Sequence, residues 1–416
     1  MIRILLSCAV IICLVSKMEA ATVSDTKNLL SDITNGYNKE VRPVNDQTEH
    51  LDVAVDMHLL SIKDFDEVSG TLNVLAAFKI DWKDISIGWD PTLYGNLTSI
   101  KMGQDNIWLP KLYNIKASDK FKAISNSDLQ VEIDYHGAIT WSPGSFLDIK
   151  CSPDVSYFPF DIQTCAIQLA AWGYTYQEVT LKSNNPAVNL DFYETNGEWS
   201  LDKSSTDVQT PGPYSFVFFN LTISRLPAFH IVNTMIPIYL LLMMNPLVFV
   251  LPCDSGERVG FSLTVFLTFT VFITIINSVL PANSDNMSRL SYYIIAVFVT
   301  SGIIASINIF QLRMYHKDEH LPVPRWVVRM MRILNCQLSP KRRIIEVCPE
   351  NTDSKSSNKK EQREAQMEEA AKVAVMDTMT WKEVVHILDT FCIWFFYVIL
   401  SVFIIFSIVT LYWGNR

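Results

Sequence analysis

The sequence has little charge for its length, and it lacks the motifs of common enzyme classes. Charged residues make up 19% of the 416 residues, whereas an average soluble domain carries about 25%. It contains no His-Glu-x-x-His, no Gly-x-Ser-x-Gly and no phosphate-binding glycine loop. The seven histidines are scattered, and the formal net charge of −9 argues against nucleic acid as a partner. We therefore expect that the protein is not an enzyme and that it has no cofactor and no metal site.

Cysteine is scarce as well, and its placement separates two compartments. Eight cysteines occur, and after the first twenty residues only Cys151 and Cys165 lie in the polar N-terminal half. Residues 21–230 hold 15 Lys and Arg against 27 Asp and Glu, so this half is acidic. Because disulfides persist in secreted domains, we expect one between Cys151 and Cys165, and reduced or membrane-embedded thiols elsewhere.

The N-terminus carries a targeting pattern. Arg3 precedes an apolar run from Ile4 to Val15, and the small residue Ala20 follows. This order predicts a cleaved signal peptide over residues 1–20. A membrane anchor is the alternative, although the run is short for a span.

Long apolar runs are confined to the C-terminal half. Four uncharged stretches are long enough to cross a bilayer. With the N-terminal block outside, the loop at 313–382 lies in the cytoplasm, where its 14 Lys and Arg satisfy the positive-inside rule. The sequence thus predicts a multi-pass plasma-membrane protein with an extracellular N-terminal domain and three helices within 230–312, followed by a fourth over 387–413. The stretches are Ile231–Leu251, Val259–Leu280, Leu290–Leu312 and Thr390–Trp413.

The block at 21–229 is built differently. Short alternating apolar segments, such as Thr71–Trp82, are separated by turn residues and predict a β-sandwich. A helix capped by its first residue is expected before them at Ser24–Asn35. The sequons Asn96-Leu97-Thr98 and Asn220-Leu221-Thr222 make Asn96 and Asn220 candidate glycosylation sites.

Two helices are expected in the cytoplasmic loop. Pro324–Leu334 sets three arginines against apolar residues such as Trp326, a pattern typical of a helix on the inner membrane face, so membrane lipids are expected partners. Glu361–Lys382 is rich in helix-forming residues and is expected to run into the last span.

The second span carries a polar stripe. At 100° per residue, seven residues share one face about 100° wide. Along this face, the cytoplasmic end carries the acidic Glu257 and the next turns carry Gly260 and the hydroxyl of Thr264. The middle carries the apolar Leu267 and Val271, and the extracellular end carries the hydroxyls of Thr274 and Ser278. It predicts a pore wall in which a ring of Glu257 favours cations and a ring of Leu267, with Val271 the next candidate, closes by dewetting. Hydroxyls that bond to neighbouring helices are the alternative. The seven residues are Glu257, Gly260, Thr264, Leu267, Val271, Thr274 and Ser278.

The two extracellular cysteines flank thirteen residues that include Phe158-Pro159-Phe160-Asp161, a stiff loop with an aromatic tip. One interpretation is that this disulfide loop has a purely structural role. The spacing also resembles the signature loop of Cys-loop receptors, the pentameric ligand-gated ion channels, and nearly the whole chain looks nicotinic-like. That family implies a β-sandwich ligand-binding domain over a four-helix membrane domain, with five subunits around a central pore. The further matching segments are Ile107-Trp108-Leu109-Pro110, Trp141-Ser142-Pro143, Gly197-Glu198-Trp199, Arg225-Leu226-Pro227 and Asp254-Ser255-Gly256-Glu257-Arg258.

The start of the second span indicates selectivity by the same resemblance. Anion-selective relatives usually carry Pro-Ala before the basic residue, whereas Gly256-Glu257 precedes Arg258 here. The resemblance therefore implies a channel for permeant cations. Ser278 stands where many nicotinic subunits have an acidic residue, so calcium permeability is left open.

The expected ligand site is an incomplete aromatic cage. By resemblance, Tyr113, Trp172 and Tyr214 match cage positions, whose ring faces attract an ammonium group. Core packing of the sandwich is the alternative role for these rings. Thr140 and Ser142 are expected to face the site from the neighbouring subunit.

Three features of the nicotinic cage are absent. The expected capping loop, Leu201–Pro213, lacks the adjacent cysteine pair, and Asp207 lies near the place of its first tyrosine. Ala77 stands where a tryptophan is expected. Two lost cation–π partners, each about 0.5–2 kcal/mol, weaken acetylcholine binding by roughly 10- to 1,000-fold.

Coupling residues follow from the resemblance too. Phe158, Pro159 and Phe160 are expected to meet the loop Leu280–Asn286. Asp66 and Glu67 are expected near Arg225, where a buried charge pair can bias a closed–open equilibrium or be merely structural.

Two functions are consistent with these residues. One is a homopentameric cation channel for a non-acetylcholine, hydrophobic small-molecule agonist, similar to the chemotactile receptors of cephalopods. The other is a non-α nicotinic subunit that works only in a heteropentamer, so the four further subunits are the same chain or different ones. A secreted-type binding protein without conduction is disfavoured by the pore stripe.

Overall fold

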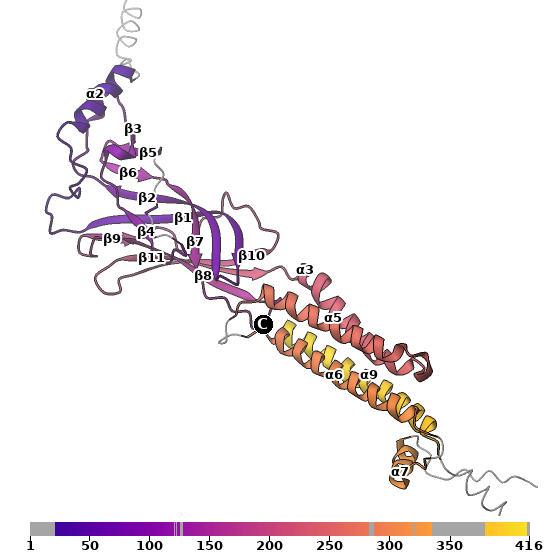
Figure 1. Ribbon diagram of the computed structural model, residues 1–416. Coiled ribbons are helices and arrows are strands. Elements are labelled where there is room, and N and C mark those ends of the chain that lie inside the picture. The colour runs from indigo at the N-terminus through magenta and orange to yellow at the C-terminus, as the bar shows by residue number, and fades with distance from the viewer. Residues whose placement is uncertain are drawn as a thin grey trace, which may run out of the picture. The chain divides into compact units, whose positions relative to one another are not determined.

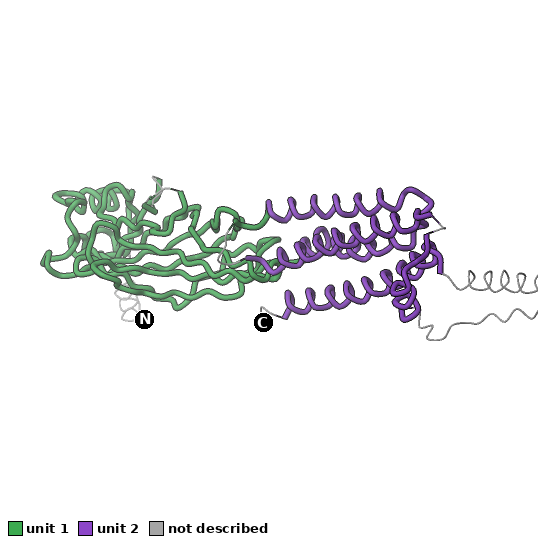
Figure 2. The backbone as a smooth tube through the Cα atoms, turned by 60° about the horizontal axis from the view of Figure 1, so that its bottom comes forward, with its two compact units in different colours: residues 1–227, 279–286 green, residues 228–278, 287–416 purple. Residues whose placement is uncertain are grey.

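The computed structural model describes residues 21–119, 121, 123–124, 128–282, 287–318, 321–334 and 379–413. The predicted signal peptide lies outside these residues, as do most of the predicted helix at 361–382 and the tail after Trp413. The chain divides into two compact units, coloured separately in Figure 2. The first holds residues up to Pro227 with Val279–Asn286, and the second holds the remainder.

The first unit opens with helix α2, Val23–Thr34. Thr22, and not the predicted Ser24, is its N-cap: the Asp25 amide donates to the Thr22 hydroxyl at 3.2 Å, and the Thr22 amide donates to the Asp25 carboxylate at 2.8 Å. This reciprocal pair is a capping box, which satisfies two amides that lack partners within the helix. Leu29 anchors the helix to the core below.

Two sheets form the sandwich of the first unit, as Figure 1 shows. One runs in the order β3-β5-β6-β2-β1-β9, with β7 also paired to β2, and the other runs β10-β11-β8-β4. The strands are β1 Leu51–Asp66, β2 Thr71–Lys83, β3 Ser99–Gly103, β4 Leu112–Asn114, β5 Gln130–Asp134, β6 Ala138–Trp141, β7 Gly144–Lys150, β8 Ile162–Ala171, β9 Val179–Lys182, β10 Trp199–Gln209 and β11 Phe216–Arg225, with short 3-10 turns η1 Pro91–Tyr94 and η2 Gln104–Asn106.

Alternation along the strands builds the core. In β2 and β11 every second residue is buried, so each strand turns one face to the space between the sheets. The inner faces meet around large side chains such as Phe78 and Phe219, whose ring centroids lie 6.1 Å apart. The β-sandwich class predicted from turn spacing is confirmed.

Among its described residues, the second unit contains four helices long and apolar enough to cross a membrane: Ala228–Val250, Glu257–Val279, Arg289–Tyr315 and Trp381–Trp413. Each begins before the uncharged stretch predicted for it. The first combines α3 Ala228–His230, η3 Ile231–Met235, α4 Ile236–Met244 and η4 Asn245–Val250, and η5 Cys253–Ser255 follows it; the other three are α5, α6 and α9.

A short amphipathic helix, α7 Arg325–Leu334, packs at the base of α9. Val327 and Met331 of α7 form a small core with Val384 of α9. Trp326 remains exposed on the opposite side of α7. The helix predicted at Pro324–Leu334 is therefore present, and one of its faces is covered by the protein itself.

Candidate functional site

Strand register gathers aromatic side chains at one end of the smaller sheet. Tyr113 on β4 and Phe216 on β11 both pair with Ala170 on β8, one from each side. Trp172 directly follows β8, and Tyr214 precedes β11 by two residues. The rings of Trp172 and Tyr214 stack with centroids 5.2 Å apart and planes 15° from parallel.

Phe121 also belongs to this aromatic cluster, although the sequence analysis does not predict it as a site residue. Its ring stacks on Tyr113 at 4.8 Å and 13°, and it meets Trp172 edge-on at 5.4 Å and 79°. Phe121 is 50% exposed and Trp172 is 44% exposed, so the cluster is a surface feature and not core packing. Phe121 lies in a loop without periodicity, so only its aromatic character within a few residues of Tyr113 could have signalled it.

The expected capping loop is mostly strand. Residues Leu201–Gln209 belong to β10 and pair with β11, which leaves a short turn before Tyr214. The Tyr176 amide donates to the Pro213 carbonyl at 2.7 Å and fastens this turn beside the loop after Trp172. Asp207 accepts a hydrogen bond from the Asn220 amide at 2.8 Å and is engaged with its neighbouring strand.

The residues expected from the complementary side lie in the other sheet. Thr140, on β6, donates to the Asp81 carboxylate at 2.6 Å, and the exposed Ser142 follows β6. Ala77 on β2 lies opposite His58 and Gly144. Within one chain these residues belong to a different sheet from the aromatic cluster, and the resemblance assigns them to the cluster of a neighbouring subunit.

A cavity of about 230 Å³ lies elsewhere in the first unit. It is lined by α2 and the segment around η1, including Asp32, Tyr37 and Trp89. None of the aromatic cluster residues belongs to this lining. The site expected from the sequence is therefore separate from this cavity.

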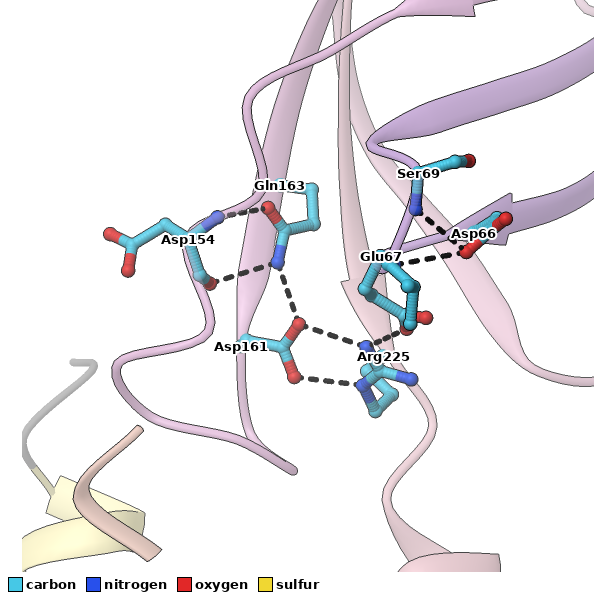
Figure 3. A network of polar contacts seen from close by, with 8 residues as sticks. Asp66, Glu67, Ser69, Asp154, Asp161, Gln163 and Arg225 are labelled. Atoms are coloured by element: carbon cyan, nitrogen blue, oxygen red, sulfur yellow. Dashed lines mark hydrogen bonds and ion pairs between the residues drawn. The ribbon is translucent and has the colours of Figure 1, made fainter. Parts of the chain in front are cut away.

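Arg225 ends β11 and joins three segments of the first unit (Figure 3). Its Nε donates to Asp161 at 2.8 Å and one terminal nitrogen donates to the second oxygen of Asp161 at 3.1 Å; that nitrogen also pairs with Glu67. The guanidinium carbon lies 4.3 Å from the Trp199 ring centroid and 4.9 Å from that of Phe158. Burial alone would lower the pKa of Arg225, but the hydrogen bonds and charges of the two carboxylates outweigh it and raise that pKa.

The outcome for the two predicted acidic partners differs. Glu67 pairs with Arg225, whereas Asp66 accepts from the amides of Val68 and Ser69 and shapes its own turn. The hydrogen bonds from Ser69 lower the pKa of Asp66 below its usual value. Asp161 is the partner that the sequence did not identify, although it directly follows Phe160.

Asp161 also accepts a hydrogen bond from the side-chain amide of Gln163. Gln163 donates to Asp161 at 2.7 Å and to the Asp154 carbonyl at 2.9 Å, and it accepts from the Asp154 amide at 2.9 Å. The two ends of the disulfide loop are thereby joined, and the Cys151–Cys165 bond closes it with a Cα–Cα distance of 5.5 Å. Of the aromatic tip, Phe158 and Pro159 are buried and Phe160 is partly buried, while the loop expected to meet them is described only to residue 282.

The stripe predicted on the second span is the exposed face of α5, Glu257–Val279. All seven of its residues are exposed, and Leu267 is 64% exposed. The buried residues of α5 repeat at helical spacing and lie roughly 160° around the helix from that stripe. They are Arg258, Ser262, Val265, Phe269 and Ile276.

Hydroxyl groups of the exposed stripe are bonded within the helix. Thr264 donates to the Gly260 carbonyl at 2.8 Å, Thr274 to Val271 at 2.7 Å, and Ser278 to Ile275 at 2.6 Å. Such bonds satisfy the hydroxyl proton without a second helix. The alternative, in which these hydroxyls bond to neighbouring helices of the same chain, does not hold for these three.

The two candidate glycosylation sites differ in setting. Asn96 is exposed in the turn after η1, with a positive φ of 61°. Asn220 is partly buried on β11, and its amide donates to Ser205 as well as to Asp207. Among the described residues, no three His, Cys, Asp or Glu side chains gather as a metal site.

The chain combines a β-sandwich that carries a disulfide loop with apolar helices long enough to span a membrane. One of these helices, α5, has a polar exposed face. Together these features are typical of a membrane receptor that contains an ion channel. Comparison with known families supports this class. The neurotransmitter-gated ion-channel ligand binding domain matches residues 26–227, and the neurotransmitter-gated ion-channel transmembrane region matches residues 234–379. The chain therefore belongs to the neurotransmitter-gated ion-channel family, whose members are pentameric channels and not enzymes.

Individual relatives are nicotinic receptor subunits. The chain is 32% identical over 318 residues to a chicken neuronal acetylcholine receptor subunit alpha-9, covering 74% of this chain and 65% of the relative. It is 29% identical over 330 residues to a Xenopus laevis acetylcholine receptor subunit alpha-1-B, with 77% and 72% covered. A goldfish neuronal subunit, non-alpha-2, is 30% identical over 309 residues, with 72% and 66% covered. The protein is a nicotinic-like plasma-membrane channel subunit with an extracellular N-terminal domain.

Proposed function

We propose that this chain forms a cation-selective channel opened by an extracellular hydrophobic small molecule other than acetylcholine. The single observation that carries the ligand proposal is the aromatic cluster, whose rings stack on one another. Phe121 covers one face of Tyr113, and Trp172 and Tyr214 cover one face of each other.

Ring stacking changes which ligands bind well. A quaternary ammonium gains its energy from open aromatic faces, each worth about 0.5–2 kcal/mol. A face already covered by another ring offers less of this attraction, whereas exposed ring edges and flat surfaces still favour burial of an apolar ligand. Together with the missing cysteine pair and Ala77, this arrangement supports a hydrophobic ligand over acetylcholine.

Cation selectivity rests on the inner end of α5. Glu257 is exposed in the first turn, and no Pro-Ala pair precedes Arg258. A ring of five such carboxylates in a pentamer raises the local concentration of cations and repels anions. Leu267, exposed in the middle of the same face, supplies the apolar constriction in this proposal.

A second candidate is a subunit that requires a different partner. The goldfish relative is itself a non-alpha subunit, and a chicken neuronal acetylcholine receptor subunit beta-3 is 28% identical over 319 residues. In that case Thr140 and Ser142 supply only the complementary face, and a partner supplies an open cage.

Voltage-clamp recording from cells that express this chain alone separates the two candidates. Currents evoked by a panel of hydrophobic compounds, but not by acetylcholine, are the expected result. Silence to every compound with surface expression confirmed, followed by currents when an α-type subunit is co-expressed, would favour the second candidate.

Phe121 gives a sharper test of the ligand proposal. Phe121→Ala uncovers Tyr113, so we expect weaker responses to hydrophobic compounds and a gain in acetylcholine sensitivity of roughly 2- to 30-fold, the equivalent of one recovered face. Leu93→Ala is the matched control, because Leu93 is 74% exposed and lies on η1. Equal effects of the two substitutions would contradict a role of the cluster in ligand choice.

A further inference from the structure

Arg258, the second residue of α5, turns away from solvent although it is adjacent to the exposed Glu257. It is 1% exposed, and its guanidinium is held by several partners within the helical unit. One terminal nitrogen donates to the Cys253 sulfur at 2.8 Å and to Asp389 at 3.1 Å. The other donates to Gln311 at 2.8 Å and pairs with the second oxygen of Asp389.

These contacts join the start of α5 and the turn before it to two helices that are far away in the sequence. Cys253 lies in the turn before α5, Gln311 on α6, and Asp389 on α9. In addition, the Asn308 amide of α6 donates to the backbone carbonyl of Arg258 at 3.1 Å. The first turn of the second helix is therefore bonded through both its side chain and its backbone.

Because α5 is a regular helix, the contacts that fix Arg258 also fix the direction of its neighbour Glu257. Consecutive residues on an α-helix project about 100° apart, so fixing the direction of Arg258 fixes that of Glu257. Arg258 belongs to the buried stripe of α5 with Ser262, and Glu257 belongs to the opposite, exposed stripe. A rotation that freed Arg258 would carry Glu257 away from the exposed stripe by the same angle.

Electrostatics explains why the anchor needs a carboxylate. A cation in the first turn of a helix is disfavoured by the helix dipole, and a buried cation without a counter-charge is strongly disfavoured. Among the described residues, Asp389 is the acidic side chain that pairs with Arg258. The bidentate pair neutralises Arg258 inside the bundle and keeps its positive charge off the face that carries Glu257.

We propose that Asp389, on the last helix, is a positioning residue for the selectivity carboxylate: through Arg258 it sets the rotation of the first turn of α5 and keeps Glu257 on the exposed stripe. The proposal rests on Glu257 lining the ion path, as proposed above. Its structural part, the rotation itself, can be measured without current or agonist.

Thiol labelling in membranes of cells expressing the full chain tests the rotation. The background carries Cys336→Ser and Cys348→Ser, and the native Cys253 and Cys392 are buried. Because Cys253 contacts Arg258, each variant is also labelled without an introduced cysteine, and that signal is subtracted. Glu257→Cys reports the exposed stripe and, in a separate chain, Ser262→Cys reports the buried one. With Asp389 intact, a biotinylated methanethiosulfonate added to opened membranes is expected to label position 257 and spare position 262, because labelling follows exposure of the thiol.

Asp389→Asn keeps the size of the side chain and removes its charge. We expect a severalfold loss of labelling at position 257, because the unpaired Arg258 turns toward water and displaces its neighbour. Adding Arg258→Gln to Asp389→Asn removes the unpaired cation, so labelling at position 257 is expected to return. Asp318→Asn is the matched control, since Asp318 is an exposed carboxylate just beyond α6, and its loss is expected to change nothing.

Two results would overturn the proposal. Unchanged labelling at position 257 in Asp389→Asn would show that Asp389 does not position Glu257. A joint rise at positions 257 and 262 that the double variant does not reverse would show a loosened bundle and a merely structural pair. If labelling behaves as expected but Glu257 variants conduct with unaltered selectivity, the positioning holds and the proposed role of Glu257 fails.

Discussion

Replacing Arg225 by glutamine leaves two carboxylates, Asp161 and Glu67, without the cation that holds them together. The side chains of Arg225, Asp161 and Glu67 are only 6%, 1% and 13% exposed. Removing one partner from such a buried pair costs about 3–5 kcal/mol, because the remaining charge is desolvated and unpaired. The contacts of the guanidinium with Trp199 and Phe158 are lost as well.

The expected shift in melting temperature follows from this magnitude. For a unit of about 200 residues, each kcal/mol moves the melting temperature by roughly 2–4 °C, so Arg225→Gln lowers it by about 6–20 °C. The measurement is thermal unfolding of the detergent-solubilised full chain, followed by size-exclusion chromatography. Asp161→Asn added to Arg225→Gln is expected to recover part of the loss, because one unpaired charge disappears. That double variant also keeps the test usable if Arg225→Gln alone fails to fold.

Lys182→Gln provides the matched control. Lys182 pairs with Asp52 at 2.6 Å, but their side chains are 55% and 48% exposed. An exposed pair of this kind contributes about 0–1 kcal/mol, so its loss is expected to shift the melting temperature by no more than a few degrees. A shift for Arg225→Gln no larger than that for Lys182→Gln would refute the reasoning from burial.

Three further predictions concern the ion path and the glycans. Replacing Glu257 and inserting Pro-Ala before Arg258 is expected to move the reversal potential toward that of chloride, and an unchanged cation reversal would remove Glu257 from the selectivity role. Leu267→Thr is expected to slow closure or raise agonist sensitivity in macroscopic currents, because a hydroxyl wets the constriction; unaltered gating would move the constriction to another level of α5. Asn96→Gln is expected to increase gel mobility by removing a glycan and Asn220→Gln to leave it unchanged, because the Asn220 amide is engaged with Asp207; the reverse pattern contradicts this assignment.

Features with a regular period could be predicted from the sequence. The apolar spans and the stripe through Glu257 and Leu267 follow from helical spacing, and the sandwich follows from alternation between turns. The predicted N-cap of α2 is wrong by two residues, because the capping box depends on a reciprocal bond between Thr22 and Asp25 that a pattern of apolar residues does not reveal.

Features made by distant residues could not be predicted in the same way. Arg258 and Asp389 are 131 positions apart, and Arg225 and Asp161 are 64 apart, so only the fold places them together. Phe121 lies in an irregular loop, where no period indicates which way a side chain points. The predicted capping loop, Leu201–Pro213, is longer than the observed turn. The reason is that β10 continues as a paired strand through polar residues whose composition is typical of a loop.

The hydroxyl groups on the exposed face of α5 each have one proton and two lone pairs. Thr264, Thr274 and Ser278 give their protons to carbonyls of their own helix. What remains directed outward is therefore a set of oxygen lone pairs without a proton to offer. Under the proposal that this face lines the ion path, such a surface would solvate a sodium or potassium ion and give a chloride ion no hydrogen bond. These side chains would then favour cations even where the helix carries no charge.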